Sequence, residues 1–268
     1  MKKFAVKKAY LFFSSLFVFC LHIPFVFAKA KPVGSTVGIK ANTYTYTLAD
    51  FKVWKAIGDS TFTETIYDSL KLGSLGLARQ AFDYAIKGFD IMKAEGELVN
   101  ENIISIIDFS KPSSKKRLFV IDLAHSKLLF NTYVAHGMHS GREFAKQFSN
   151  KPESFKSSLG FYETLGTYIG GNGYSLRLEG VEKGINDNAN KRDIVIHGAD
   201  YVNEKMIRSK GYIGRSWGCP ALPERLHKAI IDVIKNGTGL FIFSPDNNYL
   251  THSPILNQSP RQLFAMNK

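Results

Sequence analysis

The spacing of apolar residues changes near residue 100, and this change divides the chain into a helical part and a strand-rich part. Between Ser74 and Lys93, apolar residues recur every three or four positions, which is typical of an amphipathic helix packed on a core. Ser74 carries a side chain that can cap the start of this helix. A shorter helix is expected over roughly Phe62–Leu72.

After residue 103 the apolar positions form short runs of β-branched and aromatic residues, which predict strands. Residues 124–126 should form the turn of a hairpin between the second and third runs. Two helices, roughly Val202–Lys210 and Pro223–Lys235, are expected among the strands, with Pro223 suited to a first helical turn. The expected strands are Ile103–Asp108, Arg117–Asp122, Lys127–His136, Gly160–Thr164, Tyr174–Glu179, Asp193–His197 and Gly239–Phe243.

The pattern therefore predicts a mostly-β fold with flanking helices, in which a small helical N-terminal region precedes a strand-rich domain. We divide the chain into a signal peptide (1–28), an extended leader with the helical region (29–100), a catalytic domain (101–250) and a C-terminal tail (251–268). The chain has 268 residues, of which 44% are hydrophobic, enough for a sizeable core.

The N-terminus has the pattern of a secretory signal peptide. Four lysines precede an apolar run from Leu11 to Phe27, and small residues at its end suit cleavage after Ala28. An uncleaved membrane anchor is the alternative, although the run is short for a spanning helix and contains Pro24. The sequence predicts an exported protein of the periplasm or cell envelope, which touches a membrane only if the signal peptide stays attached.

Charge and cysteine content narrow the function further. The net charge is +12, and cleavage would remove four lysines and leave +8, which suits anionic wall polymers or membrane surfaces. No basic stripe with interleaved aromatics is present, so nucleic acid is not an expected partner. Cleavage also removes Cys20 and leaves Cys219 alone, so the mature chain cannot form an internal disulfide.

Cys219 and His197 are the candidate catalytic pair. Cys219 follows Gly218, which allows backbone amides to approach a bound carbonyl closely and form an oxyanion hole. His197 ends an apolar strand and precedes a glycine, a placement that supports a general base. The helix expected after Cys219 could favour the thiolate through its dipole, so we predict a thiol more reactive than a free cysteine.

These residues resemble the motif of the YkuD-like L,D-transpeptidases, in which a histidine is followed after a spacer by Ser/Thr-His-Gly-Cys. Here His197 is followed, after eighteen intervening residues, by the run Ser216–Cys219. The similarity extends from about residue 64 to 250 and resembles the murein L,D-transpeptidase catalytic domain family. Further matching segments are Asp108–Ser113, Val134–Gly137, Phe148–Asn150, Ser157–Tyr162, Ser175–Leu178 and Arg192–Ala199.

The chain departs from the wider family at two positions. Trp217 stands where relatives have a histidine, so the base cannot come from that position; Trp217 could line the cleft and cover a thioester, or be a core residue. The arginine that relatives carry after the cysteine is absent, and Arg215 is a candidate substitute for carboxylate binding. Ser216 could orient the imidazole or bind substrate, or it could bond its own turn. His136 either faces the same cleft or is a buried strand-end histidine.

The resemblance implies a β-sandwich or barrel catalytic domain and an acyl transfer on peptidoglycan stem peptides. Cys219 would form a thioester with release of D-alanine, and His197 would serve as base. The alternatives are an L,D-carboxypeptidase or amidase that hydrolyses wall peptide bonds at this site, and a non-catalytic wall-binding protein. No cofactor is expected, and no ligand spacing supports a metal, including the neighbourhood of His136 and His139.

Overall fold

The computed structural model describes residues 59–258, all of which belong to one compact unit, Thr47–Lys268. The expected signal peptide and polar leader, and the last residues of the expected tail, lie outside these described residues. Within the described part, no helix is long and apolar enough to cross a membrane.

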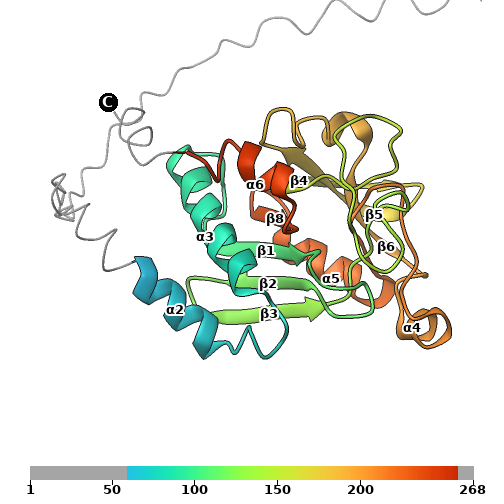
Figure 1. The fold of residues 1–268 in the computed structure, drawn as a ribbon, viewed down its shortest axis with the longest axis horizontal. Helices are drawn as coiled ribbons and strands as arrows, with labels where there is room; N and C mark the ends of the chain where they lie inside the picture. Colours follow the sequence, from blue (N-terminus) through green and yellow to red (C-terminus); the bar gives the residue numbers. More distant parts are fainter. Residues whose placement is uncertain (1–58, 259–268) are drawn as a thin grey trace, which may run out of the picture. The chain divides into compact units, whose positions relative to one another are not determined.

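A mixed sheet of eight strands forms the centre of the described structure (Figure 1). The order across the sheet is β3-β2-β1-β8-β4-β5-β6-β7. The central strands β1 and β8 are parallel, and they are buried along almost their whole length, so both faces of the sheet are covered there. The strands are β1 Ile103–Asp108, β2 Leu118–Asp122, β3 Lys127–Thr132, β4 Gly160–Gly170, β5 Gly173–Gly180, β6 Val195–Ala199, β7 Ala221–Pro223 and β8 Gly239–Phe243.

The two edges of the sheet meet just after β3. Ala135 forms an antiparallel bridge with Ala221 of β7, and its amide donates to the Ala221 carbonyl at 2.8 Å. A second bridge joins Gly137 to Ser216. This contact between the two edges of the sheet gives it a barrel-like form. It also places residues 133–141 beside the start of β7.

Helices complete the core on the outside of the sheet. Helix α3 packs against β1 and β8, and α5 packs against β5, β6 and β7. At Gly239 an added Cβ would lie 2.7 Å from the Phe89 ring of α3, so the helix approaches the strand closely. The helices are α2 Asp59–Ser69, α3 Arg79–Ala94, α4 Glu204–Lys210, α5 Glu224–Ile234 and α6 Asn247–His252, with a 3₁₀ turn η2 at Asn190–Arg192.

The mostly-β class with flanking helices is confirmed, and the differences from the expected elements have physical causes. Ser74 does not cap α3, which begins at Arg79; the buried carboxylate of Asp108 accepts the Ala78 amide at 3.0 Å instead. β3 ends at Thr132, because the chain then turns toward β7. The short strand β7 and helix α6 were not expected.

Candidate active site

A tight turn, Ser216–Cys219, presents the candidate nucleophile. The Ser216 hydroxyl donates to the Cys219 carbonyl at 2.6 Å and accepts the Gly218 amide at 3.1 Å. Gly218 has a φ of 130°, which excludes residues with a Cβ, and an added Cβ would lie 2.9 Å from Ile194 and 3.0 Å from the Lys156 carbonyl. The turn therefore has one conformation, fixed by its own serine.

This turn corrects two sequence-based interpretations. Ser216 bonds its own backbone, so it is a positioning residue and does not orient the His197 ring. The Gly218 amide is engaged with Ser216, so it is not free for an oxyanion. Within the described structure, the amides of Trp217 and Cys219 donate to no main-chain carbonyl. The Cys219 amide lies near its own sulfur and helps to lower the thiol pKa.

The Cys219 thiol lies against β6. Its Sγ accepts the Val195 amide at 3.5 Å and lies 3.6 Å from the Asp193 carbonyl, and the residue is 9% exposed. Burial raises the pKa of the Cys219 thiol, while the Val195 amide and the charge of Arg192 oppose this increase. Cys219 is a free cysteine in the described structure.

His197 lies one step along the neighbouring strand from the thiol. In the parallel pair of β6 and β7, His197 pairs with Ala221, so extending the register by two residues brings Cys219 beside Val195. The contact between the Val195 amide and Sγ agrees with this register. The thiol therefore lies beside Val195, two residues before His197 on β6.

The backbone fixes the tautomer of His197. Its Nδ1 donates to the Gly198 carbonyl at 2.8 Å, which leaves Nε2 without a proton and able to accept one. Burial lowers the pKa of His197, and the neighbouring His227 lowers it further. The sequence did not identify the group that orients the imidazole; in the structure it is a main-chain carbonyl.

The helix that follows the cysteine does not contribute as the sequence suggested. Strand β7 separates Cys219 from the first turn of α5 at Glu224, so the dipole of α5 acts at the other end of β7. Since burial raises the pKa of Cys219 and lowers that of His197, both groups favour their neutral forms. The resting pair is a thiol and a neutral imidazole, suited to general-base activation.

A half-buried cation, Arg192, stands beside the nucleophile. An added Cβ on Gly218 would lie 3.6 Å from its Nη2. The guanidinium makes four hydrogen bonds, all to residues 149–158: Nη1 to the Ser149 carbonyl at 2.7 Å and the Ser158 hydroxyl at 2.6 Å, and Nη2 to the Ser154 hydroxyl at 3.1 Å and the Lys156 carbonyl at 2.7 Å. No carboxylate of the described chain forms an ion pair with Arg192.

Ser157 joins three segments of the site. Its hydroxyl donates to the Gly218 carbonyl and accepts the Gly137 amide, both at 3.0 Å, and its amide donates to the Ser140 hydroxyl at 2.9 Å. Residues 149–158 therefore form a wall of the site, in direct contact with the nucleophile turn. Sequence reasoning placed Arg192 and Ser157 in segments that match the family but assigned them no role, because their contacts reach across the fold.

Trp217 is not a core residue. Its side chain is 74% exposed, and its ring lies 5.9 Å from that of Phe155. The core interpretation of Trp217 is therefore wrong, and a position at the surface next to Cys219 remains.

His136 is completely buried and does not present a free ring nitrogen to substrate. Its Nδ1 accepts from Arg117 at 2.8 Å, so its Nε2 donates to the Gly141 carbonyl at 3.3 Å. Burial, with Arg117 beside it, lowers the pKa of His136 to about 3. The interpretation of His136 as a substrate-binding residue is therefore corrected: it is a buried histidine between the bridges at Ala135 and Gly137, beyond the end of β3. Its carbonyl accepts the Ser216 amide at 3.0 Å.

Arg215 is bound to the neighbouring loop. Its Nη1 donates to the carbonyls of Met138 at 3.3 Å and Gly141 at 3.1 Å. The side chain is partly exposed and keeps other donors of the guanidinium, so the geometry is compatible with a carboxylate contact and does not require one.

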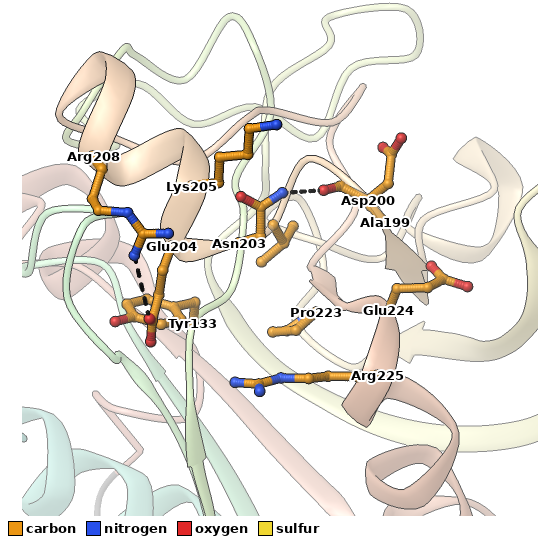
Figure 2. Close-up of a pocket in the computed structure, with 11 residues that line it drawn as sticks. Tyr133, Ala199, Asp200, Asn203, Glu204, Lys205, Arg208, Pro223, Glu224 and Arg225 are labelled. Carbon is orange, nitrogen blue, oxygen red and sulfur yellow. Dashed lines mark hydrogen bonds and ion pairs between the residues drawn. The ribbon is translucent and has the colours of Figure 1, made fainter.

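A cavity of about 380 Å³ lies at the other end of β6 and β7 (Figure 2). Ala199 and Pro223 form its floor, and charged residues of both signs surround it, among them Glu204, Arg208 and Arg225. Cys219 and His197 do not line it, so the cavity is separate from the catalytic pair. In the described chain, no three His, Cys, Asp or Glu side chains cluster as metal ligands.

A buried cysteine in the turn before β7 and an oriented histidine on the neighbouring strand β6, with a main-chain donor beside the sulfur, form the kind of site that cysteine acyl-transfer enzymes use. Residues 74–243 match the family model described as the L,D-transpeptidase catalytic domain. The chain belongs to this family, and the resemblance noted from the motifs is confirmed. A comparison with curated protein sequences finds no match.

Similar solved structures include two L,D-transpeptidases and a cell-shape protein, all at low identity, and this chain spans less than two thirds of each. An L,D-transpeptidase from Mycobacterium smegmatis is 14% identical with a TM-score of 0.32, over 53% of this chain and 59% of that one. L,D-transpeptidase 3 from Mycobacterium tuberculosis is 12% identical with a TM-score of 0.33, over 53% and 61%. The helical cell shape determining protein Pgp2 from Campylobacter jejuni is 14% identical with a TM-score of 0.35, over 54% and 48%.

Proposed function

We propose that the protein is an exported cysteine acyltransferase that acts on peptidoglycan stem peptides by L,D-transpeptidation. The observation that carries this proposal is the relation of Cys219 to His197, whose Nε2 is left free by the bond from Nδ1 to the Gly198 carbonyl. The family match supports the reaction type and the substrate class. The four N-terminal lysines and the following apolar run support export.

In the first half-reaction, His197 Nε2 takes the thiol proton as Sγ attacks the carbonyl of the third residue of a stem tetrapeptide. The Cys219 amide donates to the developing oxyanion. Collapse of the intermediate breaks the carbon–nitrogen bond, and the imidazolium returns its proton to the departing amine of D-alanine. The product is a thioester on Cys219.

In the second half-reaction, the amine of another stem attacks the thioester and loses a proton to His197, which returns it to the sulfur. The new bond is a cross-link. An L,D-carboxypeptidase or amidase would use the same steps with water in place of the amine in the second half-reaction. The exposed Trp217 belongs to the same turn as Cys219. It favours transfer over hydrolysis, because an indole over the thioester would exclude water.

The test is to incubate the mature chain with purified muropeptides and analyse the products by mass. Both routes release D-alanine in the first half-reaction. Transfer then yields new dimers, whereas hydrolysis yields tripeptides and no dimers. A protein that binds the wall without catalysis would leave the muropeptides unchanged, and that result would refute the proposal.

Replacing either member of the pair should abolish turnover and leave the fold intact. Cys219→Ala removes the covalent route, and His197→Ala removes a general base that typically contributes ~100- to 10,000-fold. D-Alanine release and thermal unfolding are measured on the same preparations, with Ile169→Ala on the exposed end of β4 as the control. Release by Cys219→Ala at the wild-type rate would exclude the thioester mechanism.

A further inference from the structure

Two aromatic rings lie at the mouth of the site, next to the nucleophile. Trp217 precedes Cys219 by two residues, and its ring is tilted by 60° to that of Phe155 at a centroid distance of 5.9 Å. His139 contacts the Phe155 ring edge-on at 5.4 Å. The proposed reaction assigns no role to Phe155, although its ring supports the exposed indole.

The backbone of Phe155 is strained. Phe155 has a φ of 52° and Glu153 a φ of 55°, in the left-handed region that bulky side chains rarely adopt. Such a conformation costs about 1–3 kcal/mol, persists only where the surroundings enforce it, and is often found at ligand sites.

Several contacts enforce this conformation. Arg192 donates to the Ser154 hydroxyl and the Lys156 carbonyl, on the two sides of Phe155. The His139 ring donates to the Ser154 carbonyl at 3.0 Å, and its amide donates to the Phe155 carbonyl at 3.1 Å. The Phe155 ring is thus held in place before any ligand arrives, which lowers the entropy that binding must overcome, and it gives the exposed Trp217 ring a fixed neighbour.

The chemistry of this surface favours a ligand with one apolar face and a polar edge. The rings offer an exposed aromatic area, while the groups around them are polar: Ser154, the partly exposed Lys156 and the exposed His139. A pyranose ring has this character, because its axial C–H groups can lie on an aromatic face while its hydroxyls bond the polar groups around it.

The distances also fit a sugar attached to the stem peptide. Trp217 and Cys219 are two positions apart, so their Cα atoms are at most about 7 Å apart. The indole side chain extends the reach of Trp217 further. The first three residues of a stem, from the sugar to the scissile carbonyl, span roughly 10 Å when extended. A carbonyl at Cys219 therefore places the sugar within reach of the two rings.

We propose that Phe155 and Trp217 form a subsite that stacks on a sugar ring of the glycan strand carrying the stem peptide. The subsite rests on the proposed function and adds that the enzyme recognises the glycan as well as the peptide. Arg192 is the positioning residue of this subsite, since its hydrogen bonds hold the strained segment.

Binding is measured by calorimetry on full-length Cys219→Ala protein, which cannot turn over the ligands. The probes are the free tetrapeptide, the disaccharide-tetrapeptide and peptide-free glycan chains. The disaccharide-tetrapeptide should bind about tenfold more tightly than the free peptide, the ratio given by ~1.4 kcal/mol of stacking. Phe155→Leu, which keeps an apolar side chain without an aromatic face, should reduce this ratio to about two.

Controls separate stacking from folding. Phe155→Trp should preserve the ratio, and Ile169→Ala, an exposed apolar residue of β4, should leave it unchanged. Equal affinities for the two peptide ligands in the Cys219→Ala protein, or an unchanged ratio in Phe155→Leu, would overturn the subsite. Turnover of both ligands by the active enzyme would meanwhile uphold the proposed function. An active enzyme that turns over neither ligand would overturn the proposed function, and the subsite with it.

Discussion

At the scale of single residues, the site depends on one buried thiol whose surroundings oppose its ionisation. Burial raises the pKa of Cys219, and Arg192 is the neighbouring cation that acts against this. In the proposed reaction, His197 receives the proton during the attack, because the Gly198 carbonyl engages its Nδ1 and leaves Nε2 as the acceptor. The site therefore resembles a general-base arrangement more than a preformed thiolate–imidazolium pair.

The sequence predicted a thiol more reactive than a free cysteine, but burial raises the pKa of Cys219 and reverses that expectation. Alkylation by iodoacetamide should be slower at neutral pH than that of a free cysteine, and Arg192→Gln should slow it further. Loss of the cation raises the thiol pKa, so the pH midpoint of the reaction shifts upward. Arg192→Lys should restore part of the wild-type profile, and Arg177→Gln on β5 serves as a control. Coincident profiles for wild type and Arg192→Gln would remove Arg192 from this electrostatic role.

Trp217→Ala should shift the product ratio from dimers toward tripeptides and leave the melting temperature nearly unchanged. The side chain is 74% exposed, so its loss opens no core cavity, whereas removing a buried Trp would cost about 3–5 kcal/mol. Trp217→His should be tolerated better than Trp217→Ala. The dimer-to-tripeptide ratio and the melting temperature are measured on the same variants. A constant ratio would count against a role in shielding the thioester.

At the scale of elements, two close approaches fix how the parts of the site meet. An added Cβ on Gly137 would lie 2.5 Å from the Phe155 carbonyl and 3.0 Å from Gly218 Cα, so three segments converge there. On helix α3, an added Cβ on Gly88 would lie 2.0 Å from the Phe161 ring, which is itself stacked on Phe241 at 4.2 Å. These glycines mark where helix and loop backbones contact the sheet.

Gly88→Ala should destabilise the protein by roughly 1–3 kcal/mol, the usual effect of overpacking. Alanine is the better helix former by about 1 kcal/mol, which opposes the overpacking. The sign of the change in unfolding free energy therefore shows whether overpacking or helix propensity is larger. Urea denaturation measures the change, and Gln80→Ala, exposed on the same helix, is the control in which the new alanine is not overpacked. A stabilised Gly88→Ala protein would mean that Phe161 can move away.

At the scale of the whole molecule, closure of the sheet connects the interior to the nucleophile. The Ala135–Ala221 bridge brings the end of β3 to β7, and Arg117 supports that junction from within. Arg117 is fully buried: its Nε and Nη2 donate to the Val134 carbonyl at 3.1 and 2.8 Å, and burial lowers its pKa to about 9. The His136 ring accepts a hydrogen bond from Arg117, and the His136 carbonyl accepts one from the Ser216 amide at the start of the nucleophile turn.

Acid should therefore weaken the whole fold through His136. Its pKa is lowered to about 3 in the folded protein, against about 6.5 in an unfolded chain, so the unfolded state takes up the proton first. Stability should fall as pH decreases from about 6.5 toward 3, by on the order of 4 kcal/mol in total. His136→Gln, which can keep both hydrogen bonds, should flatten this dependence. Urea denaturation at pH 7 and 4.5 gives the slopes; parallel slopes for both proteins would contradict the assignment.

The sequence by itself determined the elements whose patterns are complete within a few residues. β1 and β8 were predicted with the bounds that the structure shows, because continuous apolar runs are what strands covered on both faces require. Cys219 and His197 were predicted as the catalytic pair because a lone cysteine and a strand-end histidine are local signals, and the surrounding motifs identified the family.

Tertiary structure decided what depends on residues far apart in the chain. β7 is three residues long and ends in proline, so no local pattern predicts it; the sheet edge of β6 and the bridge from Ala135 create it. The protonation states of Cys219 and His197 follow from burial. The roles of Arg192 and Phe155 follow from contacts across the fold. Such environments exist only after the sheet closes, because solvent exclusion and charge proximity are properties of packing and not of sequence spacing.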